Sequence, residues 1–167
     1  ALCWSAGSNF FAAAGKAMGS RVLNRLRITT ACVLLATALL ATRGAPWPVW
    51  ATSTQIALLA VSGLIGFVFG DGWYFRSLVI LGPGRAALIA SSAPLFTAAI
   101  AWPVLHETPG PLALLGMGMT LGGIAWVVGA RRDIAHEHAE GSVAVGIGAA
   151  LLGALGQAGG YVLSKMA

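Results

Sequence analysis

The sequence predicts an all-α protein that crosses a membrane several times. Charged residues make up 9% of its 167 residues and hydrophobic residues 57%, with a mean hydropathy of +0.82. Soluble domains carry about 25% charged residues, so the polar surface available here is too small for a water-soluble fold. Long uncharged runs also recur along the chain, and about 20 apolar residues in a helix span the hydrocarbon core. These observations together predict a polytopic membrane helix bundle.

Six transmembrane helices are expected. The runs 86–105, 108–130 and 141–164 contain no charged residue and are 20, 23 and 24 residues long. The first helix is expected over 1–18. The second is expected near 28–42, with its first turn drawn from the four residues before it.

Prolines and tryptophan mark a loop before the third helix. Pro46 and Pro48 flank Trp47, and tryptophan is enriched at membrane interfaces. The third helix therefore begins near Thr54 and carries Asp71.

Asp71 is one of five acidic residues in the chain and lies in apolar surroundings. At 1.5 Å per residue it lies roughly 25 Å along its helix, near the far edge of a core about 30 Å thick, beside Trp73 and Tyr74. Two interpretations follow. Asp71 is either an interfacial carboxylate paired with Arg76 or Arg85, or a group at the mouth of a transport cavity that shares a helical face with Tyr74.

The first and sixth helices each carry a polar stripe at helical spacing. The stripe residues are Ser5, Asn9 and Lys16 on the first helix, and Gln157, Tyr161 and Lys165 on the sixth. Aligning residues 8–16 with 157–165 matches the terminal lysines of both segments. Because five spans precede the sixth helix, a repeat that starts there has inverted topology, which is typical of secondary transporters. Lys16 either extends its ammonium to the headgroups or binds an anionic solute.

Pro94 predicts a kink in the fourth helix, because it removes a backbone donor. The kink either serves as a pivot near the site or is a bend accommodated by packing, with Ser91 or Ser92 absorbing the strain.

Thr108 is expected to cap the fifth helix, with Pro109 as its first helical residue. Glu107 then lies at the positive end of the helix dipole, which indicates an electrostatic role; the alternative is a substrate or proton role.

Glycines four residues apart recur in three helices and predict close helix packing, because van der Waals contact drives helix association in lipid. The pairs are Gly66 and Gly70, Gly118 and Gly122, and Gly156 and Gly160.

An ordered set of motifs resembles the EamA domain of the drug/metabolite transporter superfamily. These motifs are Tyr74-Phe75-Arg76-Ser77-Leu78, the run 84–102 that contains Ser91-Ser92-Ala93-Pro94, His106-Glu107-Thr108-Pro109, Leu115-Gly116 and Leu121-Gly122-Gly123. The resemblance implies a five-helix repeat over 1–130, a connecting loop over 131–140 and the first helix of a second repeat over 141–167. It further implies a ten-helix protein of two inverted halves that works by alternating access, with structural roles for Glu107, Gly116 and Gly122.

The expected function is that of a secondary transporter, an exporter of small metabolites, amino acids or drugs. The alternatives are a non-transporting membrane bundle, such as a receptor or membrane-enzyme subunit, and a small multidrug-resistance-like efflux protein. We expect no enzymatic activity, cofactor, metal site or nucleic-acid partner. The expected partners are a small-molecule substrate, the lipid bilayer, the second repeat of the same chain and a second copy in a homodimer.

The expected location is the cell membrane, as a multi-pass protein of the bacterial inner membrane. Eight of the ten basic residues fall on one side of the predicted topology, which the positive-inside rule makes cytoplasmic. The family resemblance implies the opposite orientation.

Overall fold

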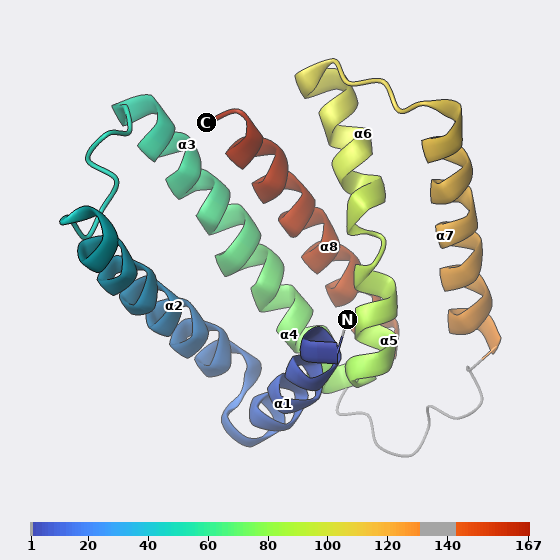
Figure 1. Ribbon diagram of the computed structural model, residues 1–167. Coiled ribbons are helices and arrows are strands. Elements are labelled where there is room, and N and C mark those ends of the chain that lie inside the picture. Colours follow the sequence, from blue (N-terminus) through green and yellow to red (C-terminus); the bar gives the residue numbers. More distant parts are fainter. Residues whose placement is uncertain (1, 131–142) are drawn as a thin grey trace.

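The structure is a bundle of helices (Figure 1). The computed structural model describes residues 2–130 and 143–167, and the side chains of residues 6–126 and 143–167. The elements are α1 (Leu2–Met18), α2 (Ser20–Arg43), α3 (Ser53–Gly63), the π-helix η1 (Leu64–Gly70), α4 (Asp71–Leu81), α5 (Pro83–Ala90), α6 (Ala93–Leu105), α7 (Pro111–Ala130) and α8 (Val143–Lys165). The loop expected at 131–140 lies outside the described residues.

These elements form six helical segments, because α3, η1 and α4 are continuous and α5 is followed directly by α6. Four segments are long and apolar enough to cross a membrane: Ser20–Arg43, Ser53–Leu81, Pro83–Leu105 and Val143–Lys165. Over the described ranges all regular structure is helical. The prediction of a polytopic helical bundle is confirmed.

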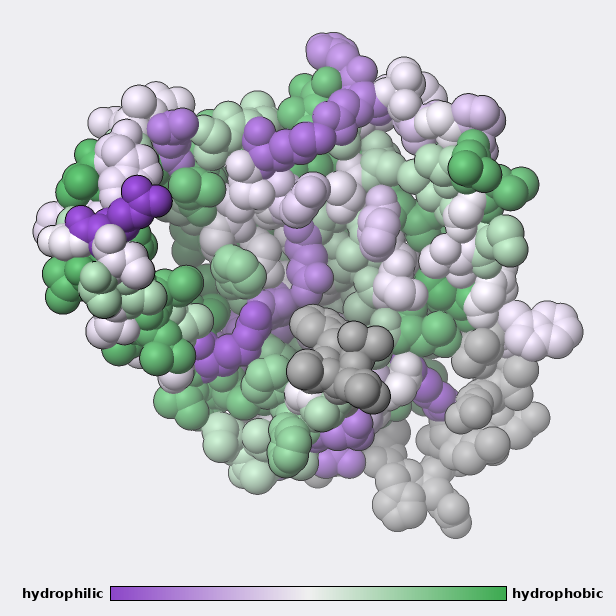
Figure 2. All heavy atoms as spheres, in the orientation of Figure 1, coloured by the Kyte–Doolittle hydropathy of each residue, from purple (hydrophilic) through white to green (hydrophobic). Residues whose placement is uncertain are grey.

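Large apolar side chains cover much of the outer surface of this bundle. Leu112 and Trp126 of α7 are 82% and 79% exposed, and Phe10 of α1 is 75% exposed. The face in Figure 2 is mostly green or white, with hydrophilic residues confined to a few patches. In a soluble protein this surface would promote aggregation, whereas lipid chains cover it in a membrane.

The second helix begins earlier than the sequence predicted. A single residue, Gly19, separates α1 from α2 and has a φ of +84°, a conformation that glycine adopts without steric cost. The chain therefore turns at once and α2 starts at Ser20 rather than near residue 28. As a result, Asn24 and Arg27 lie inside the helix, where their side chains reach the third segment.

The starts of α3 and α7 can be compared with the starts predicted from the sequence. The expected start near Thr54 is confirmed, because Thr52 and Gln55 form a reciprocal capping box at the start of α3. The expected start at Thr108 is wrong, because α7 begins at Pro111. Proline disfavours the helical conformation in the residue before it, so a helix cannot readily run through Gly110 into Pro111.

The fourth segment is broken close to Pro94, as predicted. Helix α5 ends at Ala90, and Pro94 lies in the first turn of α6, where no donor is missed. Ser91 Oγ donates to the Leu88 carbonyl at 2.5 Å, and Ser92 Oγ donates to the Ile89 carbonyl at 2.7 Å. The two hydroxyls thus satisfy carbonyls next to the break.

Helix α8 occupies the centre of the bundle. It packs against α3, η1, α4, α5 and α6, and it lies between α3 and α6 in Figure 1. Its buried face consists mostly of small residues: Gly146, Ala149, Ala150, Gly153, Ala154, Gly156, Ala158, Gly160 and Val162. Small residues allow close backbone approach, so the third segment and α8 meet at short range.

Candidate functional site

A π-helical turn sets the direction of Asp71. The Asp71 N–H donates to the Gly66 carbonyl, five residues back, at the point where η1 passes into α4. Asn24 Nδ2 of α2 donates to the Phe67 carbonyl at 3.0 Å and to the Val68 carbonyl at 3.4 Å. The extra residue of a π-turn rotates everything that follows around the helix axis, and such turns are frequent at functional sites. Asp71 is consequently buried, with 5% of its surface exposed.

Direct contact between glycines holds the third segment against α8. A Cβ on Gly156 would lie 2.7 Å from the Gly70 Cα, and a Cβ on Gly160 would lie 2.8 Å from the Gly66 Cα. Ser62 Oγ donates to the Gly160 carbonyl at 2.7 Å across the same interface. The close packing expected of these two glycine pairs is present, and the pairs pack against each other.

This contact brings Gln157 of α8 to Asp71. Gln157 Nε2 donates to Asp71 Oδ1 at 2.8 Å, while a nitrogen of the Arg27 guanidinium forms an ion pair with Asp71 Oδ2. Three segments of the bundle therefore converge on one carboxylate. Arg76 stacks instead on the ring of Trp73, at 5.3 Å from its centroid, so the ion-pair partner of Asp71 is Arg27 and not Arg76.

Two aromatic rings lie beside the Arg27 guanidinium. Its central carbon lies 5.4 Å from the Phe75 ring centroid and 6.0 Å from that of Phe67. Phe75 also meets Phe11 edge to face, with 5.2 Å between centroids. Cation–π contacts of this kind stabilise a cation away from water.

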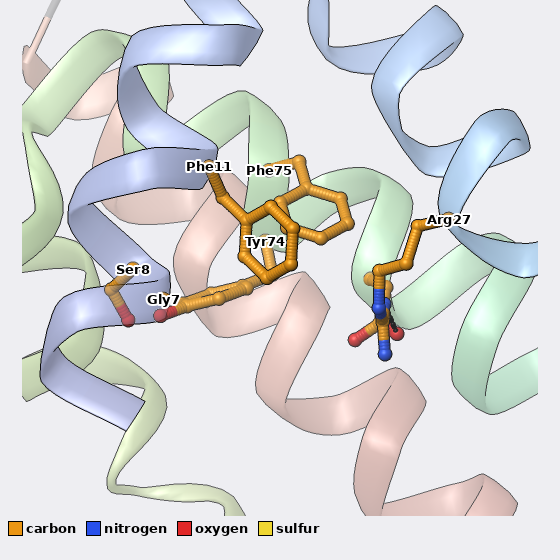
Figure 3. Close-up of a pocket in the computed structure, with 7 residues that line it drawn as sticks. Gly7, Ser8, Phe11, Arg27, Tyr74 and Phe75 are labelled. Atoms are coloured by element: carbon orange, nitrogen blue, oxygen red, sulfur yellow. Dashed lines mark hydrogen bonds and ion pairs between the residues drawn. The ribbon is translucent and has the colours of Figure 1, made fainter. Parts of the chain in front are cut away.

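A cavity of about 120 Å³ opens beside the ion pair. In Figure 3, Arg27 borders it from one side and Ser8 and Tyr74 from the other. The cavity combines charged, hydroxyl and aromatic groups within an apolar bundle, and its lining residues are Gly7, Ser8, Phe11, Arg27, Asp71, Tyr74 and Phe75. It can therefore hold a small solute that has both a polar and an apolar part.

The class of protein that contains this cavity follows from comparison with known protein families. Residues 1–129, or 129 of 167 residues, match the EamA-like transporter family. The chain belongs to the EamA-like transporter family. No curated protein and no solved structure matches it.

As an EamA-like chain, the protein is a multi-pass membrane transporter of the drug/metabolite type. Membership indicates a transporter rather than an enzyme. Among the described residues, no group of three or more His, Cys, Asp or Glu side chains is placed to bind a metal ion.

Three residues predicted for the site in this EamA-like chain come together. Asp71 and Tyr74 line the cavity, and Gln157 bonds to Asp71. Tyr74 is 4% exposed, and the third segment continues for ten residues beyond Asp71 to Leu81. Asp71 is the nineteenth of the 29 residues of this segment.

Other predicted residues lie elsewhere. Asn9 and Lys16 of α1 are exposed, and Tyr161 of α8 is 62% exposed. Glu107, expected at the positive end of the following helix, lies in the connection between α6 and α7 and forms an ion pair with Lys165 at the end of α8. The side chain of Ser5 lies outside the described part of the chain.

The glycines of α7 show a different environment from those of the third segment. Gly116, Gly118 and Gly122 are exposed, and no described atom lies within 4 Å of a Cβ built on them. Within the described residues, neither Gly116 nor Gly122 therefore makes a close contact that would explain the structural role expected of it.

Ser8, Asn24 and Arg27 are at the site but were not among the residues predicted for it. A signal for Ser8 was available, because Ser8, Ala12 and Gly15 are spaced four and three apart and form the buried face of α1. Asn24 and Arg27 are likewise three apart on one face of α2. They were missed because residues before 28 were assigned to a loop or a first turn.

Proposed function

We propose that this chain forms part of a secondary transporter that moves small molecules by alternating access, with the solute bound beside Asp71. The observation that carries the proposal is the ion pair between the partly exposed Arg27 and the buried Asp71, on the wall of a cavity in an apolar bundle. Ionisable groups are costly within a membrane, and those that occur there typically mark solute or ion pathways. A bundle that only has to pack has no need of them.

We further propose that α8 is the first helix of a second, inverted repeat. Five helical segments precede α8, and on this proposal each crosses the membrane, so that α8 enters from the side opposite to α1. The alignment of 8–16 with 157–165 pairs Ser8 with Gln157. Ser8 lines the cavity and Gln157 bonds to its carboxylate, so equivalent positions of the two repeats approach the same site. This arrangement supports a solute site between inverted repeats.

The complete transporter on this proposal has ten helices and resides in a bacterial inner membrane. The coding sequence after Ala167 provides an inexpensive test of the repeat. A further segment of about the matched length that repeats the order of proline, glutamate and glycine motifs supports it. A stop codon or an unrelated domain there contradicts it.

The transport function is tested with the full-length protein in liposomes. Efflux of amino acids, small metabolites and cationic dyes is measured with and without a pH gradient, for the wild type and for Asp71→Asn. We expect Asp71→Asn to alter solute affinity or remove the response to the gradient, because it removes the charge at the cavity. Glu107→Gln is the matched control, since Glu107 forms an exposed ion pair away from the cavity. Efflux and pH response unchanged in Asp71→Asn would exclude a solute or proton role for Asp71.

A further inference from the structure

We infer that the cavity binds a small monocarboxylate, with Arg27 as the group that recognises it. The inference rests on the proposed function and specifies the substrate class of the same site. It is carried by the hydrogen-bonding capacity of the charged pair and by the size and apolar lining of the cavity.

Arg27 has donors to spare. A guanidinium carries five N–H donors in a planar fork, and among the described residues Arg27 donates only to one oxygen of Asp71. Its side chain is 34% exposed and borders the cavity, whereas the Asp71 side chain is 7% exposed. Carboxylates bind to such a fork through two parallel hydrogen bonds in its plane. The unused donors of Arg27 therefore fit a carboxylate ligand.

Asp71 does not offer the same opening to a cation. One of its oxygens pairs with Arg27, and the other accepts from Gln157 Nε2 at 2.8 Å. Each Asp71 oxygen keeps a further acceptor site, but the side chain is only 7% exposed, so a ligand ammonium has little access to it. A carboxylate ligand instead meets the Arg27 side chain, which is 34% exposed and has further donors. The cavity therefore favours an anion over an amine.

The charge balance limits the ligand to one negative charge. Arg27 and Asp71 neutralise each other, so each added charge is uncompensated in a site of low dielectric. A dicarboxylate or a phosphate dianion would bring twice that charge. Among simple anions, a monocarboxylate brings the smallest charge that uses the spare donors of Arg27.

The remaining lining sets the size of the ligand and the character of its other end. Phe11 and Phe75 meet edge to face and provide an apolar wall, and Gly7 adds no side chain. The cavity of about 120 Å³ is smaller than the roughly 300–1,000 Å³ of typical ligand pockets, so it suits a small ligand. A carboxylate with a short hydrocarbon chain fits this space, and butanoate is the probe we choose.

The inference is tested by binding of radiolabelled butanoate to the full-length protein in lipid nanodiscs. The competitors are butanamide, butylamine and 2-aminobutanoate, which are neutral, cationic and zwitterionic compounds on the same carbon skeleton. We expect butanamide and butylamine to compete more weakly than butanoate by roughly ten- to a hundredfold, the range for a lost charge-assisted hydrogen bond. Tighter binding of 2-aminobutanoate than of butanoate would overturn the assignment to a plain monocarboxylate.

Variants identify the group that recognises the ligand. Arg27→Gln should abolish butanoate binding, and Arg27→Lys should weaken it because an ammonium lacks the planar fork. Asp71→Asn should strengthen butanoate binding several-fold, since it removes the carboxylate that competes for Arg27. Arg76→Gln is the matched control, because Arg76 stacks on Trp73 and does not line the cavity.

Arg27→Gln leaves Asp71 buried without its cation, and this variant can fail to fold. The double variant Arg27→Gln with Asp71→Asn removes both charges and should also lack butanoate binding while eluting as a monodisperse species. Loss of binding in Asp71→Asn, with butylamine as the tightest ligand, would overturn the inference and leave the proposed transport site in place. If no solute is transported and neither Arg27 nor Asp71 affects any binding, the proposed function fails as well.

Discussion

Gln157 Nε2 donates a hydrogen bond to Asp71 Oδ1 at 2.8 Å, although 86 residues separate the two in the chain. The bond ties α8 to the third segment at the carboxylate that borders the cavity. Any relative movement of these two segments must break or rearrange it. Gln157 is therefore both a structural partner of Asp71 and a candidate coupling point between the proposed repeats.

Replacing Gln157 with leucine should destabilise the protein, and its effect on unfolding should depend on whether Asp71 is present. The side chain keeps a similar volume but loses a donor to a charged acceptor, a loss that costs about 1.5–3 kcal/mol. Chemical unfolding in detergent micelles measures the change. Tyr161→Phe, one turn further along α8 and 62% exposed, should have little effect. If Gln157→Leu and Asp71→Asn show strictly additive effects on unfolding, the two side chains do not interact in the membrane protein.

A methyl group at Gly156 should disrupt the contact between α8 and the third segment. A Cβ at Gly156 would lie 2.7 Å from the Gly70 Cα, so the backbones must separate. We expect Gly156→Ala to cost about 1–3 kcal/mol, the range for overpacking, and to lengthen the Gln157–Asp71 bond. Gly159→Ala on the same helix is the control, because its Cβ would meet the Ile65 side chain at an ordinary 3.4 Å. Equal stability of the two variants would show that the glycine contact is looser than the structure indicates.

The sequence predicted the class of fold and part of this interface, because both follow from local patterns. Uncharged runs locate the segments, and the spacing of Gly66 with Gly70 and of Gly156 with Gly160 identifies faces suited to close packing. The spacing cannot say which faces meet. That depends on how each helix is rotated about its own axis in the bundle.

The rotation of each helix about its axis also explains which site residues could be predicted from the sequence. Asp71 and Gln157 stand out singly as polar groups in apolar runs. On α1, however, the visible polar residues Asn9 and Lys16 are exposed, while Ser8 lies on a face of small residues that packs inward. The sequence predicts a second helix that begins near residue 28, which makes Arg27 a basic residue of a loop or first turn. The pairing of Arg27 with Asp71 is a tertiary contact that no local pattern contains.

Glu107 should contribute little to stability or transport. Its ion pair with Lys165 joins the α6–α7 connection to the end of α8, and the two side chains are 53% and 46% exposed. Exposed pairs contribute about 0–1 kcal/mol and are screened by salt. Glu107→Gln should therefore shift the unfolding transition only slightly, and less at high salt. A change in solute affinity or pH response as large as that of Asp71→Asn would instead assign Glu107 to the solute or proton pathway.

Pro94 should affect the rate of transport more than solute binding. Its substitution by alanine supplies a backbone N–H, which has no helical partner in the present first turn of α6 but can bond to the Ala90 carbonyl if α5 and α6 join into one helix. One added helical hydrogen bond is worth about 0.5–1.5 kcal/mol, so Pro94→Ala should unfold at higher denaturant concentration. If the break is a pivot, the same variant should have a lower maximal transport rate and an unchanged solute affinity, since the cavity residues are left in place.

Pro103→Ala is the control for this prediction, because Pro103 lies inside α6 and away from the break at Ser91 and Ser92. Transport rates in liposomes and solute affinities in nanodiscs are compared for both variants. A stabilised Pro94→Ala protein that transports at the wild-type rate would mean that the break is a bend accommodated by packing, with the two serine hydroxyls bonded to the Leu88 and Ile89 carbonyls.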